Sequence, residues 1–356
     1  TSVQIKASGS YSNLGAGVSG IDIWYIGGEH TGYIQDNEWR WFSGLSPSTL
    51  YTFQAKARNQ NGIESNEASQ EVVTSIANPE YASCVVVSSK SIRAKWLPNG
   101  NPLTTDYRID CSSDASFVWI STTSGWQEDV SVYEYTFEEL LGNTRYTIRV
   151  KARNEHGLES GWVVMDSSYT RIELPGEIEW ISIGESSVTI KGINAESSNL
   201  EQGLSGISYE VYSDLYSTLV SSCDYIRESV WDSGEKLTAN TTYYYRLRSR
   251  NGDGVETNYS NIGAKATKIE DTEGIEFESV SPSVIRVVPV RKGYTNLEIY
   301  NAGIKIECVT TGESGGWHGT TGYWQHTALN PNTLYTYRGI SRNSAGLAGN
   351  WSQEYS

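Results

Sequence analysis

The stretch YTFQAKARNQNGIES, residues Tyr51 to Ser65, decides the fold of this chain because the sequence contains it four times. The near-copies are YTIRVKARNEHGLES from Tyr146, YYYRLRSRNGDGVET from Tyr243 and YTYRGISRNSAGLAG from Tyr335. All four fit one ungapped frame, L-x-x-x-T-x-Y-x-x-x-x-x-x-R-N-x-x-G, and their tyrosines lie 95, 97 and 92 residues apart. A repeat of this length in a 356-residue chain predicts a tandem array of four domains.

The residues after each frame tyrosine alternate with a period of two. In the second copy, Tyr146, Ile148 and Val150 alternate with Thr147 and Arg149. Such alternation is typical of a β-strand with one face in a core and the other in water. The R-N-x-x-G that follows predicts a hairpin turn, because glycine readily adopts a positive φ.

Each repeat also has an earlier strand that begins with Ser and Val or Ile, at Ser2, Ser91, Ser187 and Ser283. No segment shows a sustained helical period. About seven short strands in each 95 residues predict an all-β fold made of antiparallel sandwiches.

Two segments, Leu45–Tyr51 and Leu329–Tyr335, resemble the tyrosine corner of fibronectin type III domains, and Trp96 lies where that family usually has a buried tryptophan. The resemblance implies four tandem fibronectin type III-like antiparallel β-sandwiches in an extended array. The expected corner residues are Tyr51, Tyr146, Tyr243 and Tyr335. The motif K-A-R-N-x-x-G-x-E-S resembles the fibronectin type III domains of bacterial secreted and surface proteins more than those of animal proteins. The family is a scaffold, so the resemblance indicates fold far better than function.

The repeats predict domains at residues 1–76, 77–171, 172–268 and 269–356. In repeats 2 to 4 we expect a leading strand before the Ser-Val or Ser-Ile start, at residues 81–87, 178–183 and 275–280. Repeat 1 has no such strand, and the last strand of repeat 4 is truncated. Two interpretations stay open: a window from a longer array, or a polymer in which a neighbouring chain adds the missing strand head to tail.

The composition narrows the class of protein. The net charge of −15 argues against a nucleic-acid-binding protein, and no apolar run is long enough for a membrane span. Four cysteines do not make a disulfide scaffold, although Cys84 and Cys111 share a repeat and one bridge between them is an alternative. The start of the chain does not have the pattern of a signal peptide.

Motifs for catalysis or metal binding are weak. The G-x-S-x-G match at residues 312–316 lacks the strand–turn–helix setting of a catalytic serine, and the four histidines have no metal-site spacing, so surface positions are favoured for them. An interdomain calcium ion is a secondary hypothesis for the acidic linker residues Glu270, Asp271, Glu273 and Glu276. We therefore expect no enzyme activity and no cofactor.

Outward-facing Lys and Arg side chains follow each frame tyrosine, as at Arg246 and Arg248. We expect them to pair across strands with the acidic residues Asp22, Asp110, Glu210 and Glu307 rather than to bind an anion.

The chain is rich in aromatic residues, with 24 Tyr and 12 Trp. We take six of the tryptophans as candidate binding or interface residues, with core packing and stacking against sugars as alternatives: Trp39, Trp41, Trp126, Trp231, Trp317 and Trp324. Three sequons mark candidate glycosylation sites at Asn240, Asn258 and Asn350.

The sequence thus predicts a non-enzymatic structural or adhesive segment of an extracellular, cell-surface or filament-forming protein. Its partners would be proteins, with self-association head to tail or laterally, and glycans are a secondary expectation. The alternative is a set of carbohydrate-binding accessory domains from a secreted polysaccharide-degrading enzyme.

Overall fold

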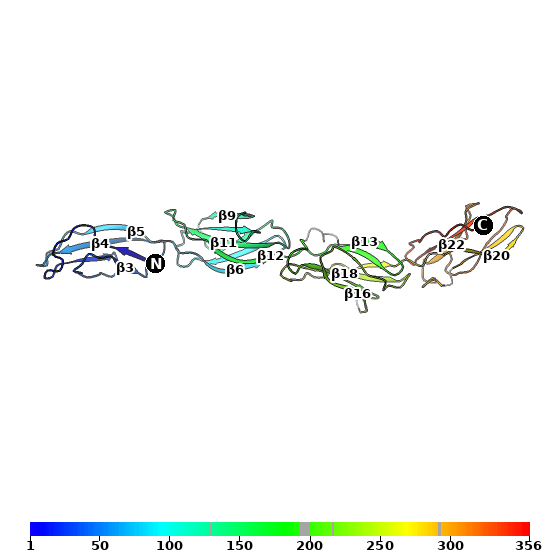
Figure 1. Cartoon of the computed structure of the whole chain (residues 1–356), viewed down its shortest axis with the longest axis horizontal. Coiled ribbons are helices and arrows are strands. Elements are labelled where there is room, and N and C mark those ends of the chain that lie inside the picture. The colour runs from blue at the N-terminus through cyan, green and yellow to red at the C-terminus, as the bar shows by residue number, and fades with distance from the viewer. Residues whose placement is uncertain (129, 193–198, 216, 291–292) are drawn as a thin grey trace. The chain divides into compact units, whose positions relative to one another are not determined.

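The computed structural model describes residues 1–128, 130–192, 199–215, 217–290 and 293–356. All regular elements in these ranges are β-strands, which form eight antiparallel sheets (Figure 1). Each repeat contributes two of the sheets. The chain divides into two compact units, Thr1–Thr170 and Arg171–Ser356, and each contains two repeats. The expected all-β sandwich fold is therefore confirmed.

Repeat 1 has a two-stranded sheet and a three-stranded sheet. The smaller sheet consists of β1 (Ser2–Ile5) and β3 (Arg40–Ser43). The larger sheet consists of β2 (Gly20–Tyr25), β4 (Leu50–Arg58) and β5 (Ala68–Val73).

Repeats 2 and 3 each have a three-stranded sheet and a four-stranded sheet. In repeat 2 the three are β6 (Glu80–Val86), β7 (Ile92–Leu97) and β10 (Glu134–Phe137), and the four are β8 (Asp106–Ser112), β9 (Thr122–Gln127), β11 (Arg145–Arg153) and β12 (Val163–Tyr169). In repeat 3 the three are β13 (Ile178–Ile183), β14 (Val188–Gly192) and β17 (Val230–Asp232), and the four are β15 (Gly206–Tyr212), β16 (Leu219–Ile226), β18 (Thr242–Arg250) and β19 (Gly263–Ala266).

Repeat 4 keeps the three-stranded sheet, with β20 (Ile275–Ser281), β21 (Val284–Pro289) and β23 (Trp324–His326). Its second sheet pairs β22 (Gly303–Cys308) with β24 (Tyr337–Arg342). The leading strands expected in repeats 2 to 4 are therefore present as β6, β13 and β20. In repeat 1, the strand that pairs with β1 in the described residues is β3.

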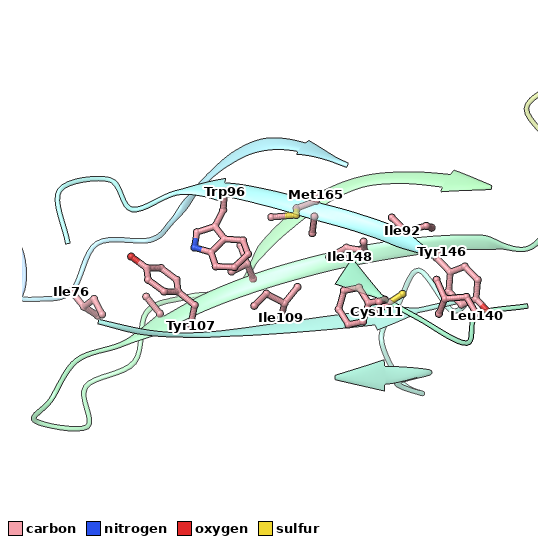
Figure 2. Close-up of a cluster of buried hydrophobic side chains, with 14 residues drawn as sticks. Ile76, Ile92, Trp96, Tyr107, Ile109, Cys111, Leu140, Tyr146, Ile148 and Met165 are labelled. Atoms are coloured by element: carbon pink, nitrogen blue, oxygen red, sulfur yellow. The ribbon is translucent and has the colours of Figure 1, made fainter. Parts of the chain in front are cut away.

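In repeat 2, the apolar residues that alternate along the strands pack together in the core. Trp96 on β7 is 2% exposed and lies 5.4 Å from the ring of Tyr107 on β8, as Figure 2 shows. Ile109 and Ile148 lie beside them in the same core cluster and are buried. The inward residues of both sheets thus bury apolar surface, which is the main favourable contribution to folding.

The four frame tyrosines make the same hydrogen bond. Each hydroxyl oxygen accepts the backbone N–H of the residue five positions earlier, at 2.8–3.1 Å. The donors are Ser46, Leu141, Thr238 and Asn330. This is the geometry of a tyrosine corner, in which a side chain fixes the loop between two sheets.

A threonine closes the same corner in repeats 1 to 3. In repeat 3, the hydroxyl of Thr267 accepts the N–H of Thr241 at 3.1 Å and donates to the carbonyl of Thr238 at 2.7 Å. Thr74 and Thr170 make the equivalent bonds. An isoleucine follows each threonine by two positions, and it is buried in the next repeat: Ile76, Ile172 and Ile269.

Trp24 on β2 is only 7% exposed, although it does not belong to the core cluster of repeat 1. It is covered because its indole stacks on His30 at 4.7 Å and its N–H donates to Gln54 at 3.0 Å. The alternative of a bridge between Cys84 and Cys111 is wrong in this structure, because both thiols are free and Cys84 contacts Met165 at 3.8 Å between sulfurs.

We predict that Tyr243→Phe destabilises repeat 3 by about 1 kcal/mol, because the partly buried hydrogen bond from the backbone N–H of Thr238 to the Tyr243 hydroxyl is lost. Hydrogen exchange of the full chain, measured by mass spectrometry, should show faster exchange in residues 237–250 and unchanged exchange in repeat 1. The matched control is Tyr244→Phe, one position along the same strand on its other face. Equal exchange in both variants would contradict the prediction.

Burial raises the pKa values of Cys84 and Cys111 from 9.0 to about 12. Because the unfolded chain releases these protons at lower pH than the folded chain, stability is unaffected below pH 9 and falls as the pH rises toward 12. We predict that iodoacetamide at pH 9 leaves both thiols unmodified in the folded protein, whereas urea-unfolded chain reacts at all four cysteines. Rapid labelling of Cys111 in the folded chain would refute this.

Candidate functional site

The six candidate tryptophans separate into three groups. Trp39 and Trp41 are 54% and 66% exposed. Trp231 and Trp324 pack against the cores of repeats 3 and 4. Trp126 and Trp317 lie between these extremes and carry cations on their rings.

Trp231 and Trp324 are turned inward by the strands that hold them. Trp231 on β17 stacks on Tyr209 with ring centres 5.5 Å apart. Trp324 on β23 stacks on His326 at 4.7 Å, and His326 is 3% exposed. For these two tryptophans the structure favours core packing, the alternative that the sequence left open.

Trp126 and Trp317 belong to ladders of alternating cations and aromatic rings. The guanidinium of Arg153 lies 4.4 Å from the Trp126 ring, and the ammonium of Lys151 lies 5.1 Å from it. In repeat 4, the guanidinium of Arg342 lies 4.4 Å from the ring of Trp317. Cations at these distances are attracted by the ring quadrupole.

In each of repeats 2 to 4, a further aromatic ring lies against an arginine of the same sheet. This aromatic residue is nine positions after the arginine of the R-N-x-x-G turn. Trp162 holds Arg149 at 4.0 Å, Tyr259 holds Arg246 at 3.8 Å and Trp351 holds Arg338 at 4.3 Å. The sequence analysis did not single out these residues, although their constant spacing from Arg153, Arg250 and Arg342 was a usable signal.

The acidic partners of the basic columns lie inside these ladders. Asp110, Glu210 and Glu307 pair with Arg149, Arg246 and Arg338 respectively, at 2.7–3.0 Å. Asp22 differs, since it pairs with His30 at 2.8 Å. In repeats 2 to 4 these pairs engage arginines of the sheet that contains the frame strand, β11, β18 or β24.

Glu210 shows the electrostatics of such a ladder. Burial by itself raises its pKa, but hydrogen bonds from Tyr212, Arg246 and Tyr259 outweigh burial, so the pKa lies below its ordinary value. Burial, followed by the hydrogen bond to Glu210, raises the pKa of Tyr259. Glu210 therefore stays ionised and Tyr259 stays protonated at neutral pH.

Trp41 lies on the outer face of the smaller sheet of repeat 1, and Trp39 directly precedes the first residue of β3. Trp41 is on β3 opposite Gln4 of β1, and Phe42 beside it points into the core. Residues two apart on an extended chain face the same side, so both indoles are presented together. A third indole that the sequence analysis did not select, Trp119 in the loop after β8, is 78% exposed.

The histidines and carboxylates do not converge on a reactive centre. His326 bonds to Glu313 at 2.9 Å and to the hydroxyl of Tyr337 at 3.0 Å, so the surface position expected for it is wrong. Ser314 of the G-x-S-x-G match forms a β-bridge with Glu307. Among the described residues no group of three or more His, Cys, Asp or Glu is arranged to hold a metal ion.

The acidic linker before β20 is occupied by hydrogen bonds within its own unit. Glu270 accepts the backbone N–H of Thr295 at 2.9 Å. Asp271 accepts the backbone N–H of Asn350 at 2.9 Å and its side-chain amide at 3.0 Å. These bonds fasten the linker to repeat 4.

Asn240 connects repeats 3 and 4 directly. Its side-chain amide donates to the carbonyls of Thr295 and Asn296, at 3.1 and 2.7 Å, and its oxygen accepts the N–H of Ser344 at 2.7 Å. In return, Asn343 of repeat 4 donates to the carbonyl of Thr267 at 2.8 Å. We call this set of contacts the joint of repeats 3 and 4.

The joint bears on the candidate glycosylation sites. Asn240 is 2% exposed, so a glycan on it is incompatible with this joint. Asn258 is exposed and can carry a glycan without disturbing the fold. Asn350 is exposed too, but a glycan would break its bond to Asp271.

The two sheets, the buried tyrosine corner and the R-N-x-x-G hairpin define a class of two-layered antiparallel β-sandwich. Residues 77–165 match the family model of the fibronectin type III domain. The match covers repeat 2, and the other three repeats share its sequence frame and its tyrosine corner.

The chain is also similar to solved structures of tandem domains. Similarity to the FN1–FN3 domains of chicken CNTN1 covers 78% of this chain and 96% of that chain, at 15% identity and a TM-score of 0.29. Similarity to a two-domain fibronectin type III segment of chicken tenascin covers 54% of this chain and 100% of that chain, at 17% identity and a TM-score of 0.37. The described residues contain no helix long and apolar enough to cross a membrane.

We predict that Asn240→Ala loosens the joint of repeats 3 and 4, because three hydrogen bonds between the repeats are lost. A glutamate-specific protease should then cut the linker at Glu270 or Glu273 several-fold faster in the full chain. The matched control is Asn332→Ala, which changes the corresponding corner residue of repeat 4. Equal cleavage rates for wild type and Asn240→Ala would contradict the role of Asn240.

Proposed function

We propose that this chain is a non-enzymatic structural or adhesive segment of an extracellular, cell-surface or filament-forming protein. The observation that carries the proposal is the pair of bare indoles of Trp39 and Trp41, of which Trp41 is on β3 and Trp39 directly precedes it. Tryptophan is a preferred anchor of protein–protein contacts, and exposed apolar groups on a rigid element lose little entropy on binding.

The partner we propose is protein, through self-association that is lateral or head to tail. The cations of the larger sheets are engaged by aromatic rings and carboxylates of their own repeat, as at Arg149 and Arg246. The net charge of −15 further disfavours an anionic partner at long range. Contacts are therefore expected where apolar groups, rather than charges, reach solvent.

The absence of enzyme activity is part of the proposal and has its own support. Side chains that could act as acids, bases or nucleophiles have structural contacts instead. His30 and His326 bond to carboxylates, and Cys111 is a fully buried thiol. Fibronectin type III domains are used as scaffolds, which agrees with these roles.

Carbohydrate binding is the second candidate function. It is favoured by the same two indoles, because Trp39 and Trp41 face one side of the sheet and can stack on successive sugar rings. In that case the chain would serve as accessory domains of a secreted polysaccharide-degrading enzyme.

We predict that the double variant Trp39→Ser, Trp41→Ser abolishes reversible self-association of the full chain, as measured by sedimentation velocity over a concentration series. Removing two exposed indoles deletes the anchors without opening the core, because both side chains are more than half exposed. The control variant is Trp119→Ser, which removes an equally bare indole from repeat 2 and should leave association unchanged.

The same proteins distinguish the two candidate functions. If the wild type is monomeric at all concentrations, and neutral polysaccharides retard it in affinity electrophoresis only when Trp39 and Trp41 are present, carbohydrate binding replaces protein contact. A wild type that does neither would contradict both functions for this pair of residues.

A further inference from the structure

Asparagine is followed directly by glycine at three places in the chain, at Asn61, Asn99 and Asn251. In this sequence an asparagine side chain loses its amide most readily, because glycine puts no side chain in the way of its own backbone nitrogen. The three asparagines differ in exposure and in hydrogen bonding, so the structure distinguishes between them.

Two of the pairs lie in R-N-x-x-G hairpins and are held by hydrogen bonds. The backbone N–H of Gly62, which follows Asn61, donates to the carbonyl of Asn59 at 3.0 Å. Asn251 is 2% exposed, and its side-chain oxygen accepts the backbone N–H groups of residues 253 and 255 at 3.1 and 2.9 Å. The reacting nitrogen is therefore engaged in the first pair, and the amide is engaged in the second.

The pair of Asn99 and Gly100 lies at the tip of an exposed tight turn. The two residues have φ angles of 53° and 77°, and the N–H of Asn101 donates to the carbonyl of Pro98 at 3.1 Å across them. Both residues are exposed. The N–H of Gly100 makes no hydrogen bond to another residue that the structure describes. Its nitrogen is thus accessible for reaction with the neighbouring side chain.

The corresponding asparagines of the other repeats are natural controls. Asn13, Asn199 and Asn296 occupy the same position of the frame and have φ angles of 56°, 47° and 49°. Each is followed by a leucine that packs in or against a core: Leu14, Leu200 and Leu297. The positive φ is therefore common to all four repeats, whereas glycine follows this asparagine in repeat 2 alone.

The turn at Asn99 also fastens the linker between repeats 1 and 2. The side-chain amide of Asn99 donates to the carbonyl of Asn78 at 3.0 Å. Asn101 holds Ala77 from both sides, because its oxygen accepts the N–H of Ala77 at 2.9 Å and its amide donates to the carbonyl at 2.8 Å. The side-chain oxygen of Asn78 accepts the N–H of Gly161 at 2.9 Å. A change in this turn would therefore reach the linker directly.

We propose that Asn99 is a site of spontaneous deamidation and that the reaction releases the linker between repeats 1 and 2. The backbone nitrogen of Gly100 loses its proton and bonds to Cγ of Asn99, while the Cγ–Nδ2 bond breaks and the nitrogen leaves as ammonia. Water then opens the five-membered succinimide at one of its two carbonyls. The products are aspartate and isoaspartate, and water is the co-reactant.

Each product weakens the hold of the turn on the linker. A carboxylate at position 99 cannot donate to the carbonyl of Asn78, and its negative charge faces that carbonyl oxygen. Isoaspartate also lengthens the backbone of the turn by one carbon atom, which displaces Asn101 from Ala77. This modification does not depend on the proposed role of Trp39 and Trp41.

The first test measures the reaction in the full chain. The protein is incubated in mildly alkaline buffer, digested and analysed by peptide mass spectrometry, with chromatographic separation of aspartate from isoaspartate. Conversion at Asn99 should be at least tenfold faster than at Asn13 and Asn296, which leucine follows. It should also be faster than conversion at Asn61 and Asn251.

The second test measures the effect on the linker. The variant Asn99→Asp carries one of the two products, and hydrogen exchange of the full chain should be faster in its residues 76–81 than in wild type. The matched control is Asn61→Asp, which makes the same change of charge before a glycine outside the linker and should leave this exchange unchanged. Incubated wild type that contains isoaspartate at position 99 should also exchange faster there.

Two results overturn the proposal. Conversion at Asn99 that is no faster than at Asn13, Asn296 or Asn61 would show that the turn does not select this site. Unchanged exchange of residues 76–81 in both Asn99→Asp and the incubated wild type would show that the reaction does not release the linker.

Discussion

The hydrogen bond between a buried tyrosine hydroxyl and a backbone N–H five residues earlier is the constraint on which the rest of each repeat depends. It fixes the corner where the chain crosses between sheets, at Tyr51, Tyr146, Tyr243 and Tyr335. Each of these hydrogen bonds ties a loop backbone to a side chain of the frame strand, so the corner takes the same geometry in all four repeats. In repeats 1 to 3 a threonine closes this corner, and the isoleucine two positions later enters the next repeat. Within each compact unit, the interaction that shapes the first sandwich therefore also places the start of the second.

The outer faces of the repeats divide into covered and bare surfaces. On the larger sheets, rings such as Trp162 and Tyr259 lie against arginines whose carboxylate partners are on the same sheet. Repeat 1 has Glu67 where the other repeats have the second ladder aromatic. It also exposes Trp39 and Trp41. Potential contacts are thus concentrated on repeat 1, although all four repeats share one frame.

Much of the fold could be predicted from the sequence because its determinants are local. The alternation after each frame tyrosine and the R-N-x-x-G turn are set by side-chain parity and by one positive-φ glycine, and the structure has both. Contacts between strands far apart in the sequence were harder to predict. The inward turn of Trp231 and Trp324 depends on short strands whose register is fixed by their partners β14 and β21. The burial of Trp24 depends on His30 and Gln54, polar residues that no apolar pattern indicates. The pairing of Asn240 with repeat 4 arises from loops that meet only after folding.

The central claim is that the bare indoles of Trp39 and Trp41 are contact surfaces while the tryptophans of the cores, such as Trp96, serve the fold. Covalent labelling of tryptophan with a water-soluble benzylating reagent, read by mass spectrometry on the isolated chain and on native assembled material, tests this most directly. The account predicts that Trp39 and Trp41 react in the isolated chain and are protected in the assembly, and that Trp96 is unreactive in both. Equal labelling of Trp39 and Trp41 in the two samples would contradict it.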